Sequence, residues 1–160
     1  MEGSNTKAID ILIVEDNAGD ARLIKEVLND TKAYGSLYLV KDGVEAMEFL
    51  RNEGKYKTSP KPDLIILDLN LPRKDGRETL AEIKNDHALK HIPIVIMTIS
   101  QAEEDILMCY NLHANCYIPK PIDLNHFIKV VKSVEDFWFS TVRLPSKSDS
   151  ICNSPDEDGI

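Results

Sequence analysis

Short apolar runs alternate along this chain with segments whose apolar residues recur at helical spacing. Five such runs are present, at residues 9–14, 37–40, 63–68, 92–97 and 116–118. The first, third and fourth runs are almost continuously apolar, as expected of strands that are covered on both faces of a parallel sheet. Pro93 lies close to the start of its run, where a strand tolerates a missing backbone N–H. The pattern predicts five strands.

Five helices are predicted, one after each strand. The apolar stripes that define them, in chain order, are Leu23, Ile24, Val27 and Leu28; Val44, Met47 and Leu50; Leu80 and Ile83; Ile106, Cys109 and Tyr110; and Phe127, Ile128, Val131, Val134 and Trp138. Asp123 is the predicted N-cap of the last helix. Five consecutive strand–helix units predict an α/β fold with a doubly wound, five-stranded parallel sheet. The sequence indicates neither an internal repeat nor a second domain.

The two ends of the chain differ from the predicted folded domain, residues 9–139. Residues 1–8 are a short leader, residues 140–145 an extension, and residues 146–160 an acidic tail with a composition typical of disorder.

Phe137, Trp138 and Phe139 are consecutive, so one helix face cannot bury all three in a single core. With Val142 they suggest an apolar patch that meets another molecule. A helix end that folds back onto its own domain is an equally good interpretation.

Composition narrows the classes of partner. The formal net charge of −8 argues against binding to nucleic acid or to an anionic membrane surface, because no basic cluster is present. No apolar run approaches the length of a membrane span, and the first residues lack the apolar core of a signal peptide. We therefore expect a cytoplasmic protein. The three cysteines and four histidines have no metal-ligand spacing, and we interpret the cysteines as reduced thiols.

Polar and charged residues stand where four of the predicted strands end: Glu15 and Asp16, Asp68, Thr98, and Lys120. Ligands of open α/β sheets bind beyond these carboxyl ends. If the first and third strands are neighbours, three carboxylates converge and repel one another unless a cation joins them, and Mg²⁺ suits oxygen ligands. Lys120 would compensate part of the charge of Asp68. Each residue alone is more often an ordinary loop or surface residue, so the signal lies in the set.

This set of residues fits phosphoryl chemistry. A carboxylate beside Mg²⁺ can attack a phosphoryl group and become an acyl phosphate. Lys120 and Thr98 would each bind an oxygen of that group. The added charge on Asp68 would draw Thr98 inward, and Tyr117 could turn into the vacated space. An ordinary half-buried strand tyrosine is the alternative interpretation of Tyr117.

Four motifs carry a resemblance to a known family: "VEDN", "LDLNLPRKDG", "IMTIS" and "YIPKPID". Over residues 9–139 the chain resembles bacterial response-regulator receiver domains. The resemblance implies the flavodoxin-like strand order 2-1-3-4-5. It also implies that Asp68 is the phosphoacceptor, and that Asp16, Asp68 and the backbone carbonyl of Asn70 hold Mg²⁺, with Glu15 acting through water.

The same resemblance assigns the remaining site residues. Thr98 and Tyr117 are the implied switch pair, Lys120 is the implied phosphate contact, and the Lys120–Pro121 peptide is expected to be cis. One departure is Ile99, which stands where the family usually has a small residue. We expect its bulk to hinder attacking water and lengthen the phosphorylated lifetime.

Residues 102–138 resemble the small regulators that serve cyanobacterial phytochromes, whose C-terminal extension helps to form a homodimer. This implies a sensor histidine kinase, a phytochrome, as partner. It also implies a homodimer contact formed by Phe137, Trp138, Phe139 and Val142. No DNA-binding domain follows in the sequence, so the output would be protein–protein contact. The protein would then catalyse only its own phosphorylation and dephosphorylation.

Two other functions remain open at this stage. A phosphatase of the haloacid-dehalogenase type would also use Asp68 and Mg²⁺, but such enzymes need a second aspartate two residues on, where this chain has Asn70. No cap domain is present to close over a small substrate. A phosphorylation-independent scaffold is the third reading, and the intact set of strand-end residues argues against it.

Overall fold

The computed structural model describes residues 8–29 and 34–146. Within them five strands form one sheet: β1 (Ile9–Val14), β2 (Tyr34–Val40), β3 (Leu64–Leu67), β4 (Ile94–Thr98) and β5 (Cys116–Pro119). Five α-helices connect or follow them: α1 (Ala18–Asn29), α2 (Gly43–Leu50), α3 (Gly76–Lys84), α4 (Glu103–Asn111) and α5 (Leu124–Glu135). Of the predicted leader and acidic tail, only Ala8 and Ser146 lie within the described residues.

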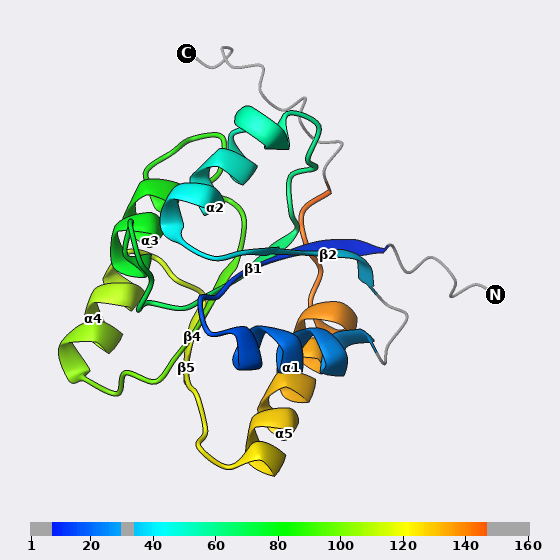
Figure 1. The fold of residues 1–160 in the computed structure, drawn as a ribbon, viewed down its shortest axis with the longest axis vertical. Helices are drawn as coiled ribbons and strands as arrows, with labels where there is room; N and C mark the ends of the chain where they lie inside the picture. Colours follow the sequence, from blue (N-terminus) through cyan, green and yellow to red (C-terminus); the bar gives the residue numbers. More distant parts are fainter. Residues whose placement is uncertain (1–7, 30–33, 147–160) are drawn as a thin grey trace.

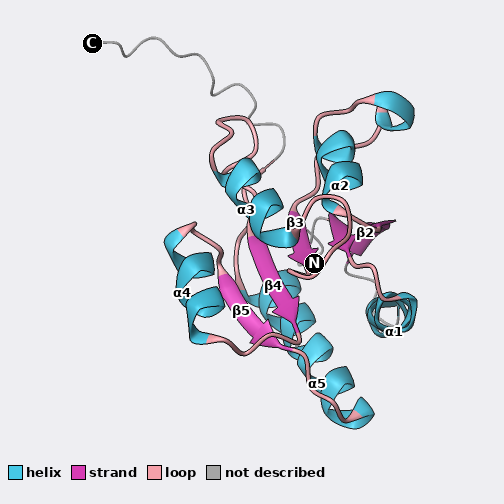
Figure 2. Cartoon of the chain, turned by 60° about the vertical axis from the view of Figure 1, so that its left-hand side comes forward, coloured by secondary structure: helices cyan, strands magenta, loops and turns pink. Residues whose placement is uncertain are grey.

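The sheet is parallel throughout, with the order β2-β1-β3-β4-β5. The predicted doubly wound α/β fold and its strand order are therefore confirmed. Helices α1 and α5 cover one face, and α2, α3 and α4 cover the other (Figures 1 and 2). The main error in the predicted strands is the start of β2, which pairs with β1 from Tyr34 rather than from residue 37. Gly35 hides this start, because glycine carries no strand signal.

Alternation along β1 shows why the strands are apolar throughout. Ile11 and Ile13 pack in the core under α1 and α5, whereas Leu12 and Val14 pack under the helices of the other face. All four side chains are at most 1% exposed. A strand with helices on both faces must be apolar at every position, so the sequence shows a run rather than an alternation.

The aromatic segment after α5 forms a π-helical turn, Asp136–Thr141. Its end is closed by the Val142 N–H, which donates to the carbonyl of Phe137 at 3.0 Å. Trp138 and Phe139 are half-buried against the core beneath α1 and α5, whereas Phe137 is 49% exposed. Cys116 packs against the same core as Trp138 and Phe139. The helix end thus folds back on its own domain with two of its three aromatic side chains, and it leaves the third at the surface.

One expectation is wrong. The Lys120–Pro121 peptide is trans, and no cis peptide occurs among the described residues. The trans form of an X–Pro bond is favoured by about 0.5–1 kcal/mol unless the surroundings select cis. Here a trans bond already lets Lys120 reach the strand ends.

None of the helices in the described part of the chain is long and apolar enough to cross a membrane.

The thiols agree with the sequence interpretation where they can be seen. Cys109 is a buried free thiol in α4, and Cys116 is a half-buried free thiol in β5. Cys152 lies outside the described residues. Within the described ranges, no group of three or more histidine, cysteine, aspartate or glutamate side chains stands ready to hold a metal ion.

Candidate functional site

The sheet ladder brings Glu15 and Asp68 together at its carboxyl edge. The Asp68 N–H donates to the carbonyl of Val14 at 3.1 Å, and the Glu15 N–H donates to the carbonyl of Val40 at 3.0 Å. Each residue is therefore the first one beyond its strand. Both carboxylates are buried, with Glu15 only 3% and Asp68 only 6% exposed. Two buried like charges in adjacent positions need compensation.

Lys120 supplies that compensation from the end of the edge strand β5. Its N–H donates to the carbonyl of Thr98 at 2.7 Å, which sets it directly beside the end of β4. Its ammonium lies 3.1 Å from Asp68 Oδ2, 2.9 Å from Glu15 Oε1 and 2.8 Å from Asp20 Oδ2. Glu15 and Asp68 were predicted from the sequence, whereas Asp20 was not, although its place in the first turn of α1, at the same edge, was a signal.

The electrostatics of this cluster are unbalanced, because the carboxylates outnumber the ammonium. Burial raises the pKa of Glu15 to about 7; the charge of Asp68 adds to this, while contact with Lys120 opposes it. Burial by itself would lower the pKa of Lys120. Its hydrogen bonds to Asp20 and Glu15 outweigh burial and raise that pKa above its ordinary value. The cluster is therefore suited to receive a further positive charge.

The donor set at the end of β1 and β3 fits a hard divalent cation. Asp16 is exposed in the loop that follows Glu15, and Asp68 stands on the neighbouring strand. The Asn70 N–H donates to Asp68 Oδ1 at 3.3 Å, which fixes the loop that carries the Asn70 carbonyl. Mg²⁺ is commonly bound through one or two carboxylates and keeps several waters. Asp16, Asp68 and the Asn70 carbonyl are the groups at this edge that would supply such ligands.

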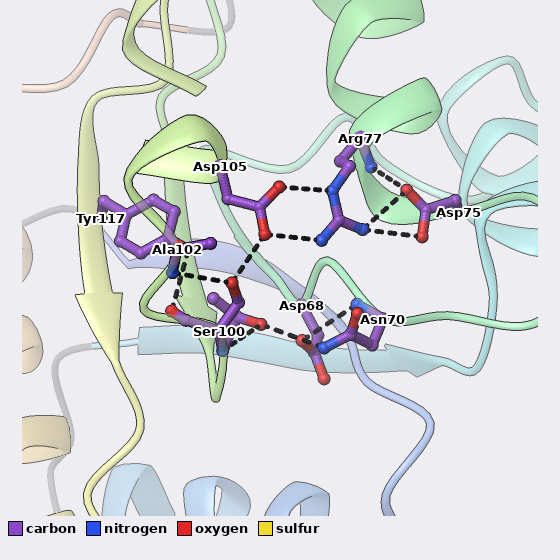
Figure 3. Close-up of polar contacts among 9 residues, drawn as sticks. Asp68, Asn70, Asp75, Arg77, Ser100, Ala102, Asp105 and Tyr117 are labelled. Atoms are coloured by element: carbon purple, nitrogen blue, oxygen red, sulfur yellow. Dashed lines mark hydrogen bonds and ion pairs between the residues drawn. The ribbon is translucent and has the colours of Figure 1, made fainter. Parts of the chain in front are cut away.

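Thr98 and Tyr117 both contact the loop after β4, but no hydrogen bond joins them directly. Thr98 is fully buried, and its Oγ1 accepts from Asn70 Nδ2 at 3.5 Å and from the Ser100 N–H at 3.4 Å. The Tyr117 hydroxyl donates to the carbonyl of Ser100 at 2.9 Å (Figure 3). Tyr117 is half-buried and already turned toward this loop. Ile99, between Thr98 and Ser100, is 68% exposed.

Comparison with known proteins assigns this arrangement to a family. The response regulator receiver domain model matches residues 11–132. The chain belongs to the response regulator receiver family. It is 49% identical over 136 residues to the response regulator Rcp1 of Synechocystis sp., covering 85% of this chain and 92% of that protein.

Two solved structures are similar over nearly the whole receiver domain. A phosphorylated cyanobacterial phytochrome response regulator, RcpA, has a TM-score of 0.85 and 51% identity, covering 88% of this chain and 100% of that one. The Mn²⁺-bound form of Rcp1 has a TM-score of 0.84 and 48% identity, covering 86% and 99% of the two chains. This protein is thus a signalling domain of the same family and fold.

An ion-pair network links α3 and α4 beside the loop after β4. Arg77 Nε and Nη2 donate to the two carboxylate oxygens of Asp105, each at 2.8 Å, and Arg77 Nη1 lies 3.1 Å from Asp75 (Figure 3). The Ser100 hydroxyl donates to the same Asp105 carboxylate at 2.6 Å. The Arg77 guanidinium and the Ser100 hydroxyl lower the pKa of Asp105 to about 2. This network could not be predicted from the sequence, because the two helices meet only in the folded chain.

Gly76 holds the loop after Asp68 in place. A Cβ added at Gly76 would lie 2.1 Å from the carbonyl oxygen of Asp68 and 2.6 Å from the Cα of Leu69. Its N–H donates to the Leu69 carbonyl at 2.9 Å. The "DG" of the quoted motif therefore has a steric reason: α3 begins so close to the Asp68 backbone that only hydrogen fits.

The predicted dimer residues stand apart from this cluster. Phe137, Trp138, Phe139 and Val142 follow the end of α5. Because α5 leaves the carboxyl edge after β5 and packs along α1, these residues lie far along the helix from Lys120. The receiver domain thus carries its strand-end site and the apolar segment on separate parts of its surface.

Proposed function

We propose that Asp68 accepts a phosphoryl group from a sensor histidine kinase and that the protein then signals through protein–protein contacts. The observation that carries this proposal is the environment of Asp68. Its buried carboxylate has one oxygen 3.1 Å from the Lys120 ammonium and the other 3.3 Å from the Asn70 N–H, beside the acidic residues Glu15 and Asp16. A carboxylate so oriented is a suitable nucleophile for a phosphoryl group.

The proposed reaction is a single displacement at phosphorus. An Asp68 carboxylate oxygen forms the new P–O bond, and the bond from phosphorus to the donor breaks, leaving its electron pair on the donor. One N–H of the Lys120 ammonium changes its acceptor from the carboxylate to a phosphoryl oxygen, and the Thr98 hydroxyl donates to a second phosphoryl oxygen. Asp16, Asp68 and the Asn70 carbonyl would hold Mg²⁺, with Glu15 acting through water. When bound, the ion neutralises charge on the phosphoryl oxygens.

The switch follows from the contacts of Thr98 and Ser100. A phosphoryl group on Asp68 brings roughly one to two additional negative charges and new acceptor oxygens. Thr98 would exchange its contact with Asn70 for one of these oxygens, and the Ser100 N–H moves with it. Because Ser100 also holds Tyr117 and Asp105, the change would reach β5 and α4. Ile99, exposed in the same loop, would shield the acyl phosphate from water.

The partners are proposed from similarity. Rcp1 and RcpA are both response regulators, and RcpA is a phytochrome response regulator, so we propose a phytochrome as the cognate kinase. The Mn²⁺ bound to Rcp1 supports a divalent ion in this chain too. We propose a homodimer through Phe137, Trp138, Phe139 and Val142, of which Phe137 offers the most apolar surface. A kinase of this type would place the protein in the cytoplasm.

The test is the intact-protein mass after incubation with acetyl phosphate, with and without Mg²⁺. Wild type is expected to gain one phosphoryl group only when Mg²⁺ is present, and Asp68→Asn is expected to gain none. Asp136→Asn, an exposed aspartate beyond α5, is the matched control and should behave like wild type. An adduct that persists in Asp68→Asn would overturn the assignment. Rapid donor turnover without adduct would favour a hydrolase, and no turnover would favour a scaffold.

A further inference from the structure

The Lys120 ammonium is surrounded by three carboxylates, and one of them has no part in the proposed reaction. A lysine ammonium has three N–H donors. Three carboxylate oxygens, from Glu15, Asp20 and Asp68, lie between 2.8 and 3.1 Å from it. Asp68 is the proposed phosphoacceptor and Glu15 belongs to the proposed cation site. Asp20 has neither role, yet its contact with Lys120 is the shortest of the three.

The start of α1 fixes where Asp20 lies. Asn17 precedes the helix, and its Oδ1 accepts from the Asp20 N–H at 2.9 Å, so it caps the first turn. The Asn17 N–H donates in turn to Glu15 Oε2 at 3.1 Å, which joins the cap to the strand-end cluster. From this turn Asp20 reaches across to Lys120, a partner 100 residues later in the chain. The backbone around Asp20 is therefore held on both sides.

We propose that Asp20 is a positioning residue that keeps the Lys120 ammonium at the reaction centre while Asp68 gains its phosphoryl group. This role rests on the proposed function of Asp68. During the transfer, the contact between Lys120 and Asp68 is exchanged for one with a phosphoryl oxygen, and Glu15 would help to hold the cation. Only the contact with Asp20 is independent of both changes. Without it, the ammonium at the end of a flexible four-carbon chain loses its constant partner.

A purely structural role for Asp20 is the competing explanation. An acidic residue in the first turn of a helix interacts favourably with the helix dipole whatever its partner. That role would lower stability when Asp20 is neutralised but would leave the position of Lys120 and the rate of phosphoryl uptake unchanged. The two explanations therefore differ in kinetics and in the environment of the Lys120 ammonium.

The kinetic test compares Asp20→Asn, Asp20→Glu and the control Glu26→Gln in acetyl phosphate assays with Mg²⁺. Glu26 lies on the same helix, is 66% exposed, and has Arg22 as its salt-bridge partner at 3.8 Å, so its loss removes the same charge without touching Lys120. We expect the maximal rate of Asp68 phosphorylation to fall about three- to tenfold in Asp20→Asn, as for loss of one charge-assisted hydrogen bond. The donor concentration for half-maximal rate should stay within about twofold. Asp20→Glu keeps the carboxylate and should restore most of the rate.

A second measurement is independent of phosphorylation. The side-chain ¹⁵N–¹H signal of Lys120, assigned by its loss in Lys120→Arg, reports how well the ammonium is held against exchange with water. We expect it to broaden or shift in Asp20→Asn and to be unchanged in Glu26→Gln. Normal uptake rates in Asp20→Asn, or equal losses in Asp20→Asn and Glu26→Gln, would overturn the proposal. If wild type gains no phosphoryl group, the proposed function fails and this role fails with it, whereas failure of Asp20 alone leaves uptake by wild type intact.

Discussion

Replacement of Arg77 by alanine tests whether the contact between α3 and α4 stabilises the fold. The change removes both hydrogen bonds to Asp105, at 2.8 Å each, and the contact with Asp75 at 3.1 Å. Asp105 then keeps only the hydroxyl of Ser100 as a hydrogen-bond donor among these groups. The loop that contacts Thr98 and Tyr117 would lose its tie to α3.

The expected size follows from geometry and exposure. A hydrogen bond to a charged group contributes about 1.5–3 kcal/mol when shielded, whereas exposed ion pairs contribute about 0.2–1 kcal/mol. The side chains of Arg77 and Asp105 are 29% and 14% exposed, so this mostly shielded bidentate pair falls in the lower part of the first range. We therefore expect Arg77→Ala to lower the free energy of unfolding by about 2 kcal/mol at neutral pH. Arg77→Lys keeps the charge but not the planar fork, and should lose about half as much.

The pH dependence has a definite sign. The pKa of Asp105 is lowered to about 2, chiefly by Arg77, so this carboxylate stabilises the fold when ionised. A depressed folded-state pKa gives stability that is present above the ordinary value of an aspartate, near 3.9, and is lost as the pH falls toward 2. The difference between wild type and Arg77→Ala should therefore be constant from pH 5 to 7 and shrink below about pH 4.

Urea unfolding followed by circular dichroism measures these differences. A double-mutant cycle of Arg77→Ala with Asp105→Asn should give a coupling free energy of about 1–2 kcal/mol. The control is Arg22→Ala, whose partner Glu26 is 3.8 Å away and whose side chain is 79% exposed, and it should change stability by less than about 0.5 kcal/mol. A coupling near zero, or a loss in Arg77→Ala no larger than in Arg22→Ala, would refute the reasoning.

Three further predictions concern the loops around Asp68. Gly76→Ala should lower the free energy of unfolding by about 1–3 kcal/mol or more in thermal unfolding, because the added Cβ would meet backbone atoms. The control Gly19→Ala should leave it unchanged, because the atom nearest to the added Cβ is 3.4 Å away. Glu15→Gln should flatten the pH dependence of urea unfolding. Burial raises the pKa of Glu15 to about 7, so the free energy of unfolding of wild type should fall as the pH rises from about 4.5 to 7, and an equal fall in the variant would contradict this. Ile99→Ala should shorten the phosphorylated lifetime in a dephosphorylation assay, and an unchanged rate would remove the proposed shielding.

The apolar pattern was enough to predict the fold, since covered strands must be apolar at every position. It identified β1, β3 and β4 because helices cover both of their faces. Gly35 hid the beginning of β2, where pairing with β1 rather than side-chain pattern defines the strand. The π-helical turn after α5 was likewise hidden, because its identity depends on which carbonyl accepts the N–H of Val142.

For the site, the sequence determined which residues stand at strand ends, because the first residue beyond a strand is fixed by local pattern. Only the tertiary structure decided which of them meet. The contact of Lys120 with Asp20 spans 100 residues of chain, and that of Arg77 with Asp105 spans 28. Such pairs leave no periodic signal, because nothing within a local window of sequence depends on them. Strand order and helix packing create these contacts, so Asp20 and Arg77 became visible only in the folded chain.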